Sequence, residues 1–209
     1  MKHSNALSLG FKGERTYIHG TDMLNATMQS INSHIPYARI EKLDFKISTM
    51  TNQMLTCHWW PKSAPQTLEG KTTASFTVQI DGVEYEGKLI QADEYAETRR
   101  AYDELPVLNQ CVYASAGRSV SLRDMPENFT QIEVLVAMNK ALLLKELSIP
   151  GSSQWVFCRW ESSAWPLSEN LSGVQLTLEQ TLGTRLTRSS VKLNAEHIGT
   201  IYFSALDVE

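Results

Sequence analysis

The sequence predicts an α+β protein of two tandem units, each a long helix followed by antiparallel strands. A Cys-x-Trp signature occurs twice, as Cys57-His58-Trp59 and as Cys158-Arg159-Trp160. Each copy follows an Asp-Met pair, by 35 residues from Asp22 and by 34 residues from Asp124. A repeat near this length is typical of a duplicated domain rather than of a solenoid. We therefore expect two copies of one structural unit.

A second repeated pair supports the duplication. Glu84-x-x-Gly87 is echoed by Glu196-x-x-Gly199, and the offset between copies grows from 101 to 112 residues, as if 11 residues had been inserted. The predicted domains are a first unit at 1–92, a connecting helix and linker at 93–112, and a second unit at 113–209. A chain of 209 residues that is 42% hydrophobic is long enough to bury a core in this arrangement.

The first unit is predicted to begin its regular structure with a helix. Apolar residues recur at helical spacing from Thr21 to His34, and Thr21 or Asp22 stands where an N-cap is expected. Pro36 follows the predicted end. A short strand at 15–19 is a further candidate, just before the helix.

Four strands are predicted after this helix. Alternating apolar and polar residues indicate two strands joined by a turn at Thr49-Met50-Thr51-Asn52. Asp81-Gly82 lies between two more alternating runs, and this dipeptide is the strongest short signal for a β-hairpin. The strands are expected at 42–47, 55–59, 76–80 and 83–89.

The second half repeats this order less clearly. Phe129, Ile132, Leu135 and Met138 predict a helix that begins after Asp124-Met125-Pro126-Glu127. Strands are expected at 142–149, 154–160, 173–178, 191–193 and 199–205. The segment 93–105 between the two halves carries tyrosines and several charges, which predicts a surface helix that Pro106 ends.

Composition excludes several classes of function. The 19 basic and 23 acidic residues give a net charge of -4 without a lysine or arginine run, so nucleic acid is not an expected partner. Gly10 and the charged residues after it interrupt any apolar leader, and no segment is apolar enough to span a membrane. Three cysteines without CxxC spacing indicate a reducing cytoplasm. No two histidines have metal-ligand spacing, so neither a metal nor another cofactor is expected.

A long helix followed by an antiparallel sheet, present twice in one chain, resembles the double hot-dog fold. In that superfamily a curved sheet wraps the helix of each unit, and the two units stand in for a homodimer. The resemblance covers most of the chain and rests on element order, repeat length and the repeated residues above. Such units often pair through their sheets, and further homo-oligomers are common among them.

The resemblance implies chemistry on acyl thioesters of coenzyme A or acyl carrier protein. In the thioesterase branch, an acidic residue near the start of the helix acts as base or nucleophile, and backbone amides there polarise the thioester carbonyl. The residues at matching places here are Asp22 and Asp124. His19 would assist Asp22, and the amides near Gly20 and Met23 would polarise the carbonyl.

Each of these residues also has a structural interpretation. Asp22 and Asp124 are explained as helix caps, and His19 as a loop histidine in a structural hydrogen bond. Trp59 and Trp160 are candidate floors of a substrate pocket, although tryptophans on alternating strands usually belong to the core.

Two alternatives remain open from the sequence. A binding or scaffolding protein could have kept the fold and the acyl pocket and lost catalysis. A 3-hydroxyacyl thioester dehydratase would need a histidine and acid pair, for which His19 with Glu133 of the other copy is the candidate. The dehydratase sequence contexts are absent, so the sequence favours the thioesterase.

Overall fold

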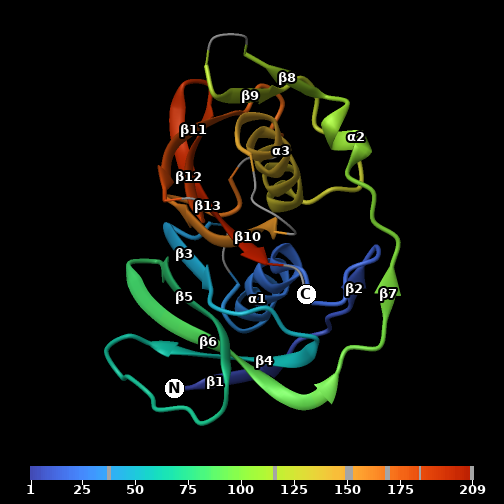
Figure 1. Ribbon diagram of the computed structural model, residues 1–209. Helices are drawn as coiled ribbons and strands as arrows, with labels where there is room; N and C mark the ends of the chain where they lie inside the picture. The colour runs from blue at the N-terminus through green and yellow to red at the C-terminus, as the bar shows by residue number, and fades with distance from the viewer. Residues whose placement is uncertain (37–38, 115–116, 149–152, 168–169, 184, 208–209) are drawn as a thin grey trace. The chain divides into compact units, whose positions relative to one another are not determined.

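The computed structural model describes residues 1–209 except 37–38, 115–116, 149–152, 168–169, 184 and 208–209. The protein consists mostly of antiparallel strands with few helices (Figure 1). It divides into two compact units, the first formed by Met1–Tyr102 with Ser163–Trp165, and the second by Asp103–Ser162 with Pro166–Glu209. The boundary after Tyr102 falls inside the predicted connecting segment.

The first unit packs one long helix with a five-stranded antiparallel sheet. The sheet order is β1-β4-β6-β5-β3, and β2 and β7 form a separate parallel pair. Apolar side chains of α1 and of alternate strand positions make the core, among them Leu24, Ile31, Phe45 and Trp59. The elements are β1 (His3–Ala6), β2 (Phe11–Lys12), α1 (Gly20–His34), β3 (Lys42–Ile47), β4 (Gln53–Pro61), β5 (Thr72–Ile80), β6 (Val83–Tyr95) and β7 (Arg99–Arg100).

The predicted hairpin at Asp81-Gly82 is confirmed. Ile80 of β5 lies opposite Val83 of β6, which leaves a two-residue loop. Asp81 and Gly82 both have positive φ, 48° and 75°. Positive φ at both loop positions defines the type I′ turn, whose twist matches that of the flanking strands.

The predicted turn between β3 and β4 is wrong, although both strands exist. β3 pairs with β5, and β4 pairs with β1 and β6, so 49–52 connects strands that are not neighbours. The strand considered at 15–19 is also not formed, since only Ile18 makes an isolated bridge, to Phe11. Alternation identifies a strand, but its partner is decided by distant residues.

The predicted helix at 93–105 is wrong as well. β6 continues to Tyr95, β7 follows at Arg99–Arg100, and a single helical turn, α2, spans Leu105–Leu108. Pro106 lies in the first turn of α2 rather than after its end, where a missing amide hydrogen costs nothing. Exposed charges therefore indicated a surface position here and not a helix.

The second unit has a sheet ordered β10-β13-β12-β11-β9-β8 around its own long helix. Its hairpin between β12 and β13 again has a two-residue loop, in which Asn194 and Ala195 have φ of 51° and 68°. The elements are α2, β8 (Cys111–Tyr113), β9 (Ser119–Leu122), α3 (Gln131–Glu146), β10 (Ser153–Ser162), β11 (Gln175–Leu182), β12 (Leu186–Leu193) and β13 (Glu196–Asp207).

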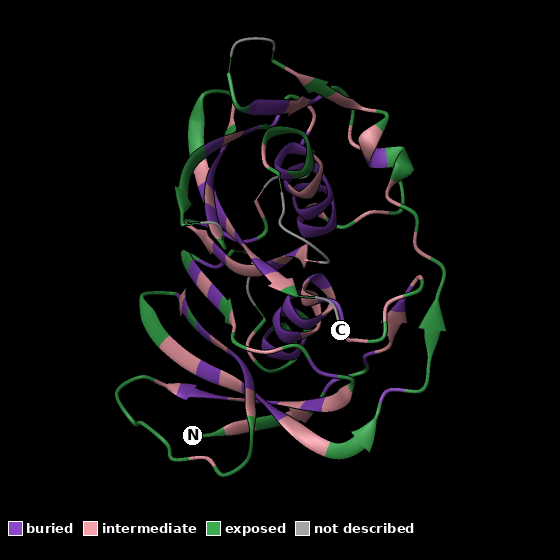
Figure 2. Ribbon diagram, viewed as in Figure 1, coloured by how far each residue is buried: buried purple, intermediate pink, exposed green. Residues whose placement is uncertain are grey.

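Helix α3 is longer and begins later than predicted. The N-cap is Thr130, so Asp124 lies six residues before it, in an exposed bend. The strand predicted at 142–149 is wrong, because α3 continues to Glu146, and 149 lies outside the described residues. Every residue from Ile132 to Asn139 is buried, which Figure 2 shows as continuous purple on this helix. A helix that is buried on all sides lacks the apolar periodicity from which its end could be predicted.

The repeated sequence signatures differ in how well they align the units. Glu84-x-x-Gly87 and Glu196-x-x-Gly199 both lie on the last strand that a unit contributes to the main sheet, β6 and β13. The two Cys-x-Trp signatures do not correspond, because β4 is the second strand after α1 whereas β10 is the first strand after α3. The match between Asp22 and Asp124 also fails, since only Asp22 lies within a helix.

Candidate functional site

The β2–β7 pair brings two basic residues to the start of α1. The strands are parallel, with Phe11 opposite Arg99 and Lys12 opposite Arg100. The amide of Phe11 donates to the carbonyl of Thr98 at 2.8 Å. A Cβ atom on Gly10 would lie 2.3 Å from Thr98 Oγ1, so only glycine permits this close approach.

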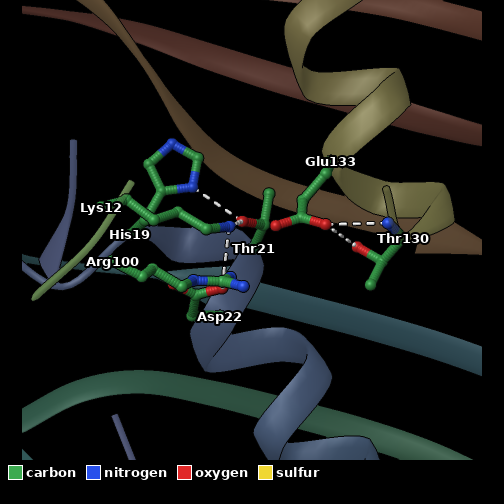
Figure 3. A network of polar contacts seen from close by, with 7 residues as sticks. All are labelled: Lys12, His19, Thr21, Asp22, Arg100, Thr130 and Glu133. Carbon is green, nitrogen blue, oxygen red and sulfur yellow. Dashed lines mark hydrogen bonds and ion pairs between the residues drawn. The ribbon is translucent and has the colours of Figure 1, made fainter. Parts of the chain in front are cut away.

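Asp22 joins these two cations. Its Oδ1 lies 2.8 Å from Nζ of Lys12 and accepts a hydrogen bond of 2.7 Å from the guanidinium of Arg100 (Figure 3). The Lys12 side chain is fully buried, and the Asp22 side chain is only 13% exposed. A buried ammonium requires a counter-ion, because burial without one costs several kcal/mol, about 3–5 by analogy with broken buried pairs. Asp22 therefore holds Lys12 in place.

Thr21 links Lys12 to His19. Lys12 Nζ donates to Thr21 Oγ1 at 2.8 Å, and His19 Nδ1 lies 2.7 Å from the same oxygen (Figure 3). Lysine can only donate, so the hydroxyl either donates to Nδ1 or accepts the hydrogen of Nδ1 on its second lone pair. The second arrangement leaves Nε2 of this buried histidine unprotonated and able to accept a proton. Tyr102 lies beneath Lys12, with Nζ 4.6 Å from the ring centroid.

His19 itself, and not Thr21 or Asp22, is the N-cap of α1. It has extended φ and ψ and makes no side-chain capping hydrogen bond, while its carbonyl accepts the amides of Asp22 at 3.0 Å and Met23 at 3.2 Å. The Met23 amide is thus engaged within the helix. The helix start leaves the amides of Gly20 and Thr21 without an intrahelical acceptor.

The helix of the second unit begins with a different device, a capping box. Oε2 of Glu133 accepts the amide and the hydroxyl hydrogens of Thr130, both at 2.8 Å (Figure 3). Glu133 is buried and is the third residue of α3, as Asp22 is of α1. Thr-x-x-Glu is the sequence signature of this box, so the true counterpart of Asp22 was detectable at Thr130-Gln131-Ile132-Glu133.

Trp59 lies at the opposite end of α1 from Asp22. Its ring stacks on His3, with centroids 4.1 Å apart, and meets the edge of His34, the last residue of α1, at 6.0 Å. Twelve helical residues separate Asp22 from His34, or about 18 Å at 1.5 Å per residue. The structure thus does not bring Trp59 to the predicted site.

Trp160 is a core residue of the second unit. It is fully buried on β10, and its indole Nε1 donates to Ser162 Oγ at 3.1 Å. The ring lies against Gly199, where a Cβ would be only 2.4 Å from it. The predicted site residues of the first unit therefore separate into His19, Gly20, Asp22 and Met23, which lie together, and Trp59, which lies at the other end of α1, whereas Asp124 and Trp160 belong to the second unit.

Cys57 and Cys111 carry no reactive thiol. Burial raises the pKa of Cys57 to about 12 and the pKa of Cys111 to about 11. A thiol with so high a pKa is almost wholly protonated at neutral pH and is a poor nucleophile. Among the described residues, no three His, Cys, Asp or Glu side chains are grouped to hold a metal ion. None of the described helices is long and apolar enough to cross a membrane.

Comparisons with known proteins give structural likeness only. No protein-family model and no curated protein matches the sequence. The structure is similar to the tesB protein of Mycobacterium avium subsp. paratuberculosis, with 9% identity, a TM-score of 0.47 and coverage of 100% of this chain and 93% of that one. It is also similar to an acyl-ACP thioesterase from Bacteroides thetaiotaomicron, with 11% identity, a TM-score of 0.42 and coverage of 98% of both chains.

A third similar structure is the dehydratase domain from the CurK module of curacin polyketide synthase. It shares 11% identity at a TM-score of 0.45, over 100% of this chain and 92% of that domain. Likenesses this remote assign no activity. The arrangement of the chain itself, long helices packed with antiparallel sheet, is hot-dog-like, as the sequence led us to expect.

Proposed function

We propose that this protein consists of two tandem hot-dog-like units and hydrolyses an acyl thioester of coenzyme A or acyl carrier protein. Three shared features support the duplication. Each long helix has an acidic third residue, Asp22 or Glu133. Each unit ends in a hairpin with a two-residue, positive-φ loop. Each last strand carries the Glu-x-x-Gly repeat.

The observation that carries the hydrolase proposal is the convergence of donors and a base at the start of α1. The amides of Gly20 and Thr21 lie at the positive end of the helix dipole, where a thioester oxygen that gains negative charge is stabilised. His19 lies beside them and is held by Thr21. This arrangement supplies an oxyanion site and a group that can accept a proton from water.

The reaction then balances within this site. His19 Nε2 takes a proton from water, and the water oxygen attacks the thioester carbon, whose oxygen is stabilised by the amides of Gly20 and Thr21. The carbon–sulfur bond breaks, and His19 returns the proton to the leaving thiolate. A carboxylic acid and a free thiol are the products.

Asp22 has a different role in this proposal from the base or nucleophile that the family resemblance implies. Its Oδ1 is occupied by Lys12 and Arg100, so the carboxylate anchors the cations that surround the helix start. Lys12 in turn positions Thr21, and Thr21 positions His19. Asp22 is thus a positioning residue.

The test is hydrolysis of a panel of acyl-CoA and acyl carrier protein thioesters, measured as the amount of free thiol released. We expect His19→Gln to lower kcat at least about 100-fold, in the range typical of a lost general base. Asp124→Asn is the matched control for Asp22→Asn and should retain full activity. If Asp22→Asn abolishes turnover at a temperature where it is fully folded and His19→Gln does not, Asp22 is the reacting group and the proposal for His19 is wrong.

A non-catalytic binding protein is the second candidate, and one observation favours it. The polar side chains at the start of α1 already satisfy one another, as expected for a structural network. Binding of a non-hydrolysable acyl-CoA analogue without turnover of any panel member would support this candidate. The panel includes a 3-hydroxyacyl thioester, so that dehydration would be detected by loss of water from the substrate.

A further inference from the structure

A groove on the first unit arises from its strand order. β4 and β5 both run antiparallel to β6, which lies between them, so the connection 62–71 must cross β6. β4 ends at Pro61, opposite Tyr85 of β6, whereas β5 begins at Thr72, opposite Ile90 of β6. The connection therefore also runs back along the length of the sheet, from the end of β4 to the start of β5. Gln66 of this connection lines a groove of about 340 Å³ with residues of the sheet.

The sheet side of this groove consists of two rows of side chains across the strands. One row is acidic and contains Asp44 of β3, Thr77 of β5 and Glu86 of β6, which are register partners. The other row is basic and contains Lys46, Ser75 and Lys88 on the same three strands. The rows are two residues apart along each strand, or about 6.8 Å. All six side chains lie on the face away from the buried residues Phe45, Phe76 and Leu89.

Among the described side chains, the two lysines of the basic row are not paired with the carboxylates of the acidic row. Lys46 and Lys88 form no ion pair within the described part of the chain, although carboxylates lie in the adjacent row. Glu86 is held in place because its Oε1 accepts the indole hydrogen of the buried Trp60 at 2.8 Å. Fixed carboxylates and uncommitted ammonium groups on facing rows form a dipolar surface.

Beyond the groove, the basic row continues onto β4 with His58, which does not line the groove itself. His58 is the register partner of Lys88, and its Nδ1 is buried with no hydrogen-bond partner among the described residues. Burial, and next the charge of Lys2, lower the pKa of His58, so the ring is neutral at pH 7. A buried ring nitrogen without a partner costs free energy unless a ligand or water satisfies it.

We propose that this groove binds a small dipolar molecule of the free amino acid type. Its carboxylate lies between Lys46 and Lys88 and accepts the hydroxyl of Ser75, and its ammonium group faces Asp44 and Glu86. The charged groups of an α-amino acid are about 2.5–3 Å apart, so with a hydrogen bond of about 2.8 Å at each end the molecule joins groups about 8 Å apart, which side chains rising from rows about 6.8 Å apart can reach. The groove volume falls at the small end of the range for ligand sites, which suits a molecule of this size.

The site belongs to the first unit alone and is independent of the proposed hydrolysis. In the second unit β11 and β12 are direct neighbours, with Leu182 opposite Leu186, so the connection between these two strands crosses no other strand. The groove is also built from the sheet face opposite the buried core, whereas the start of α1 is reached through β2 and β7. Loss of one function need not affect the other.

The first test is a titration of the isotope-labelled full chain with each of the free L-amino acids. Binding is measured from changes in the chemical shifts of backbone amides in the NMR spectrum. We expect at least one to bind at millimolar concentration or below and to shift residues of β3, β5 and β6. The N-acetyl derivative of that amino acid lacks the ammonium group, and its amide lacks the carboxylate, so both should bind at least 10-fold more weakly. Equal binding of the N-acetyl derivative, or binding of none of the amino acids, would overturn the proposal.

The second test uses matched lysine variants of β3 and β6. Lys46→Gln and Lys88→Gln should each weaken binding at least 10-fold. Lys42→Gln changes an exposed lysine on the same strand face that does not line the groove, and it should change binding less than twofold. These lysines lie on the solvent side, so all three variants should melt together with the unchanged protein. If Lys42→Gln weakens binding as much as Lys46→Gln, the attraction is only the general charge of the face, and the site is refuted.

Discussion

The starts of the two long helices solve the same electrostatic problem in different ways. In α3 the acidic third residue, Glu133, bonds its own N-cap, Thr130, and the box is complete within four residues. In α1 the acidic third residue, Asp22, instead binds Lys12 and Arg100, which come from strands before and after it in the chain. The first solution needs only local sequence. The second depends on tertiary structure and brings a histidine and a buried lysine to one point, as a reactive site requires.

The two sheets also differ, although the strands follow each helix in the same chain order. In the first unit the second strand of the last hairpin, β6, pairs with β4. In the second unit the first strand of the last hairpin, β12, pairs with β11. Exchanging the two strands of a hairpin turns a short connection into a long one, since 62–71 must cross β6 while β11 and β12 adjoin directly. The added connection creates the groove, so the difference in topology produces a difference in surface chemistry.

The largest predicted effect tests the tertiary charge cluster. Asp22→Asn removes a counter-ion of the fully buried Lys12 and should destabilise the protein by about 3–5 kcal/mol. Asp124→Asn, in an exposed bend of the second unit, should cost less than about 0.5 kcal/mol. Chemical denaturation of both variants measures the difference. Equal small losses would mean that Asp22 and Asp124 are both ordinary surface acids and that the helix starts do not differ as described.

The next largest loss of stability is expected when one glycine in each unit is replaced by alanine, and the loss should be equal in the two units. A Cβ on Gly87 would lie 2.3 Å from the Phe76 ring, and one on Gly199 would lie 2.4 Å from the Trp160 ring. Gly87→Ala and Gly199→Ala should therefore each cost about 1–3 kcal/mol, or more where the ring cannot move. Gly117→Ala is the control, because its nearest neighbour would be 3.8 Å away. A cost in only one unit would weaken the correspondence of the last strands.

The sequence was informative where structure is local. The periodicity from Thr21 to His34 and the Asp81-Gly82 hairpin are short-range patterns, and both predictions hold. The alignment through Cys-x-Trp failed because strands that alternate in the same way look alike, whatever their place in the sheet. Asp124 resembled a helix start because an Asp-x-Pro-Glu sequence carries the right residue types, but the capping box lies further along at Thr130.

The charged site could be predicted only in part. His19, Gly20 and Asp22 are neighbours in the sequence, so their proximity follows from the helix start. Lys12 and Arg100 are 88 residues apart and meet through a two-residue parallel pair that no local pattern announces. A fully buried lysine also contradicts the usual expectation from composition, which places lysine at the surface. Such exceptions are visible only once the strands are paired.

A smaller loss of stability is expected from substitution of the two N-cap residues, which compares the two helix starts directly. Thr130→Ala removes the hydroxyl contacts of the capping box, while the backbone amide of residue 130 can still donate to Glu133, and should cost about 1–2 kcal/mol. His19 makes no side-chain capping hydrogen bond, so His19→Ala should spare helix capping and lose side-chain contacts such as those with Thr21 and Tyr102. Circular dichroism melts of the two variants give the comparison. If His19→Ala destabilises as much as Thr130→Ala, the histidine is chiefly structural, which would also count against its role in hydrolysis.

Replacement of Asn139 should increase the stability of the protein, in contrast to the substitutions above. It lies within α3, fully buried, and neither atom of its amide group has a hydrogen-bond partner among the described residues. Replacing a buried, unsatisfied amide by an apolar group of similar shape removes a desolvation penalty, so Asn139→Leu should stabilise the protein by about 1–2 kcal/mol. The free energy of unfolding decides this. A loss of stability would show that the amide is satisfied by water or a ligand in solution.

The smallest effect is a dependence on pH confined to the first unit. Burial, together with the charges of His34 and the N-terminus, lowers the pKa of His3, and burial also lowers that of His58 on the neighbouring strand. Because the unfolded chain titrates near the usual value of about 6.5, it binds more protons than the folded chain below that pH, so stability is lost as the pH falls through this range and is fully present above it. Hydrogen exchange of β1 and β4 amides at pH 7.5 and 5.5 should show this loss, and the double variant His3→Gln with His58→Gln should reduce it. His197→Gln in the second unit is the control, and an equal reduction by this variant would place the dependence outside the first unit.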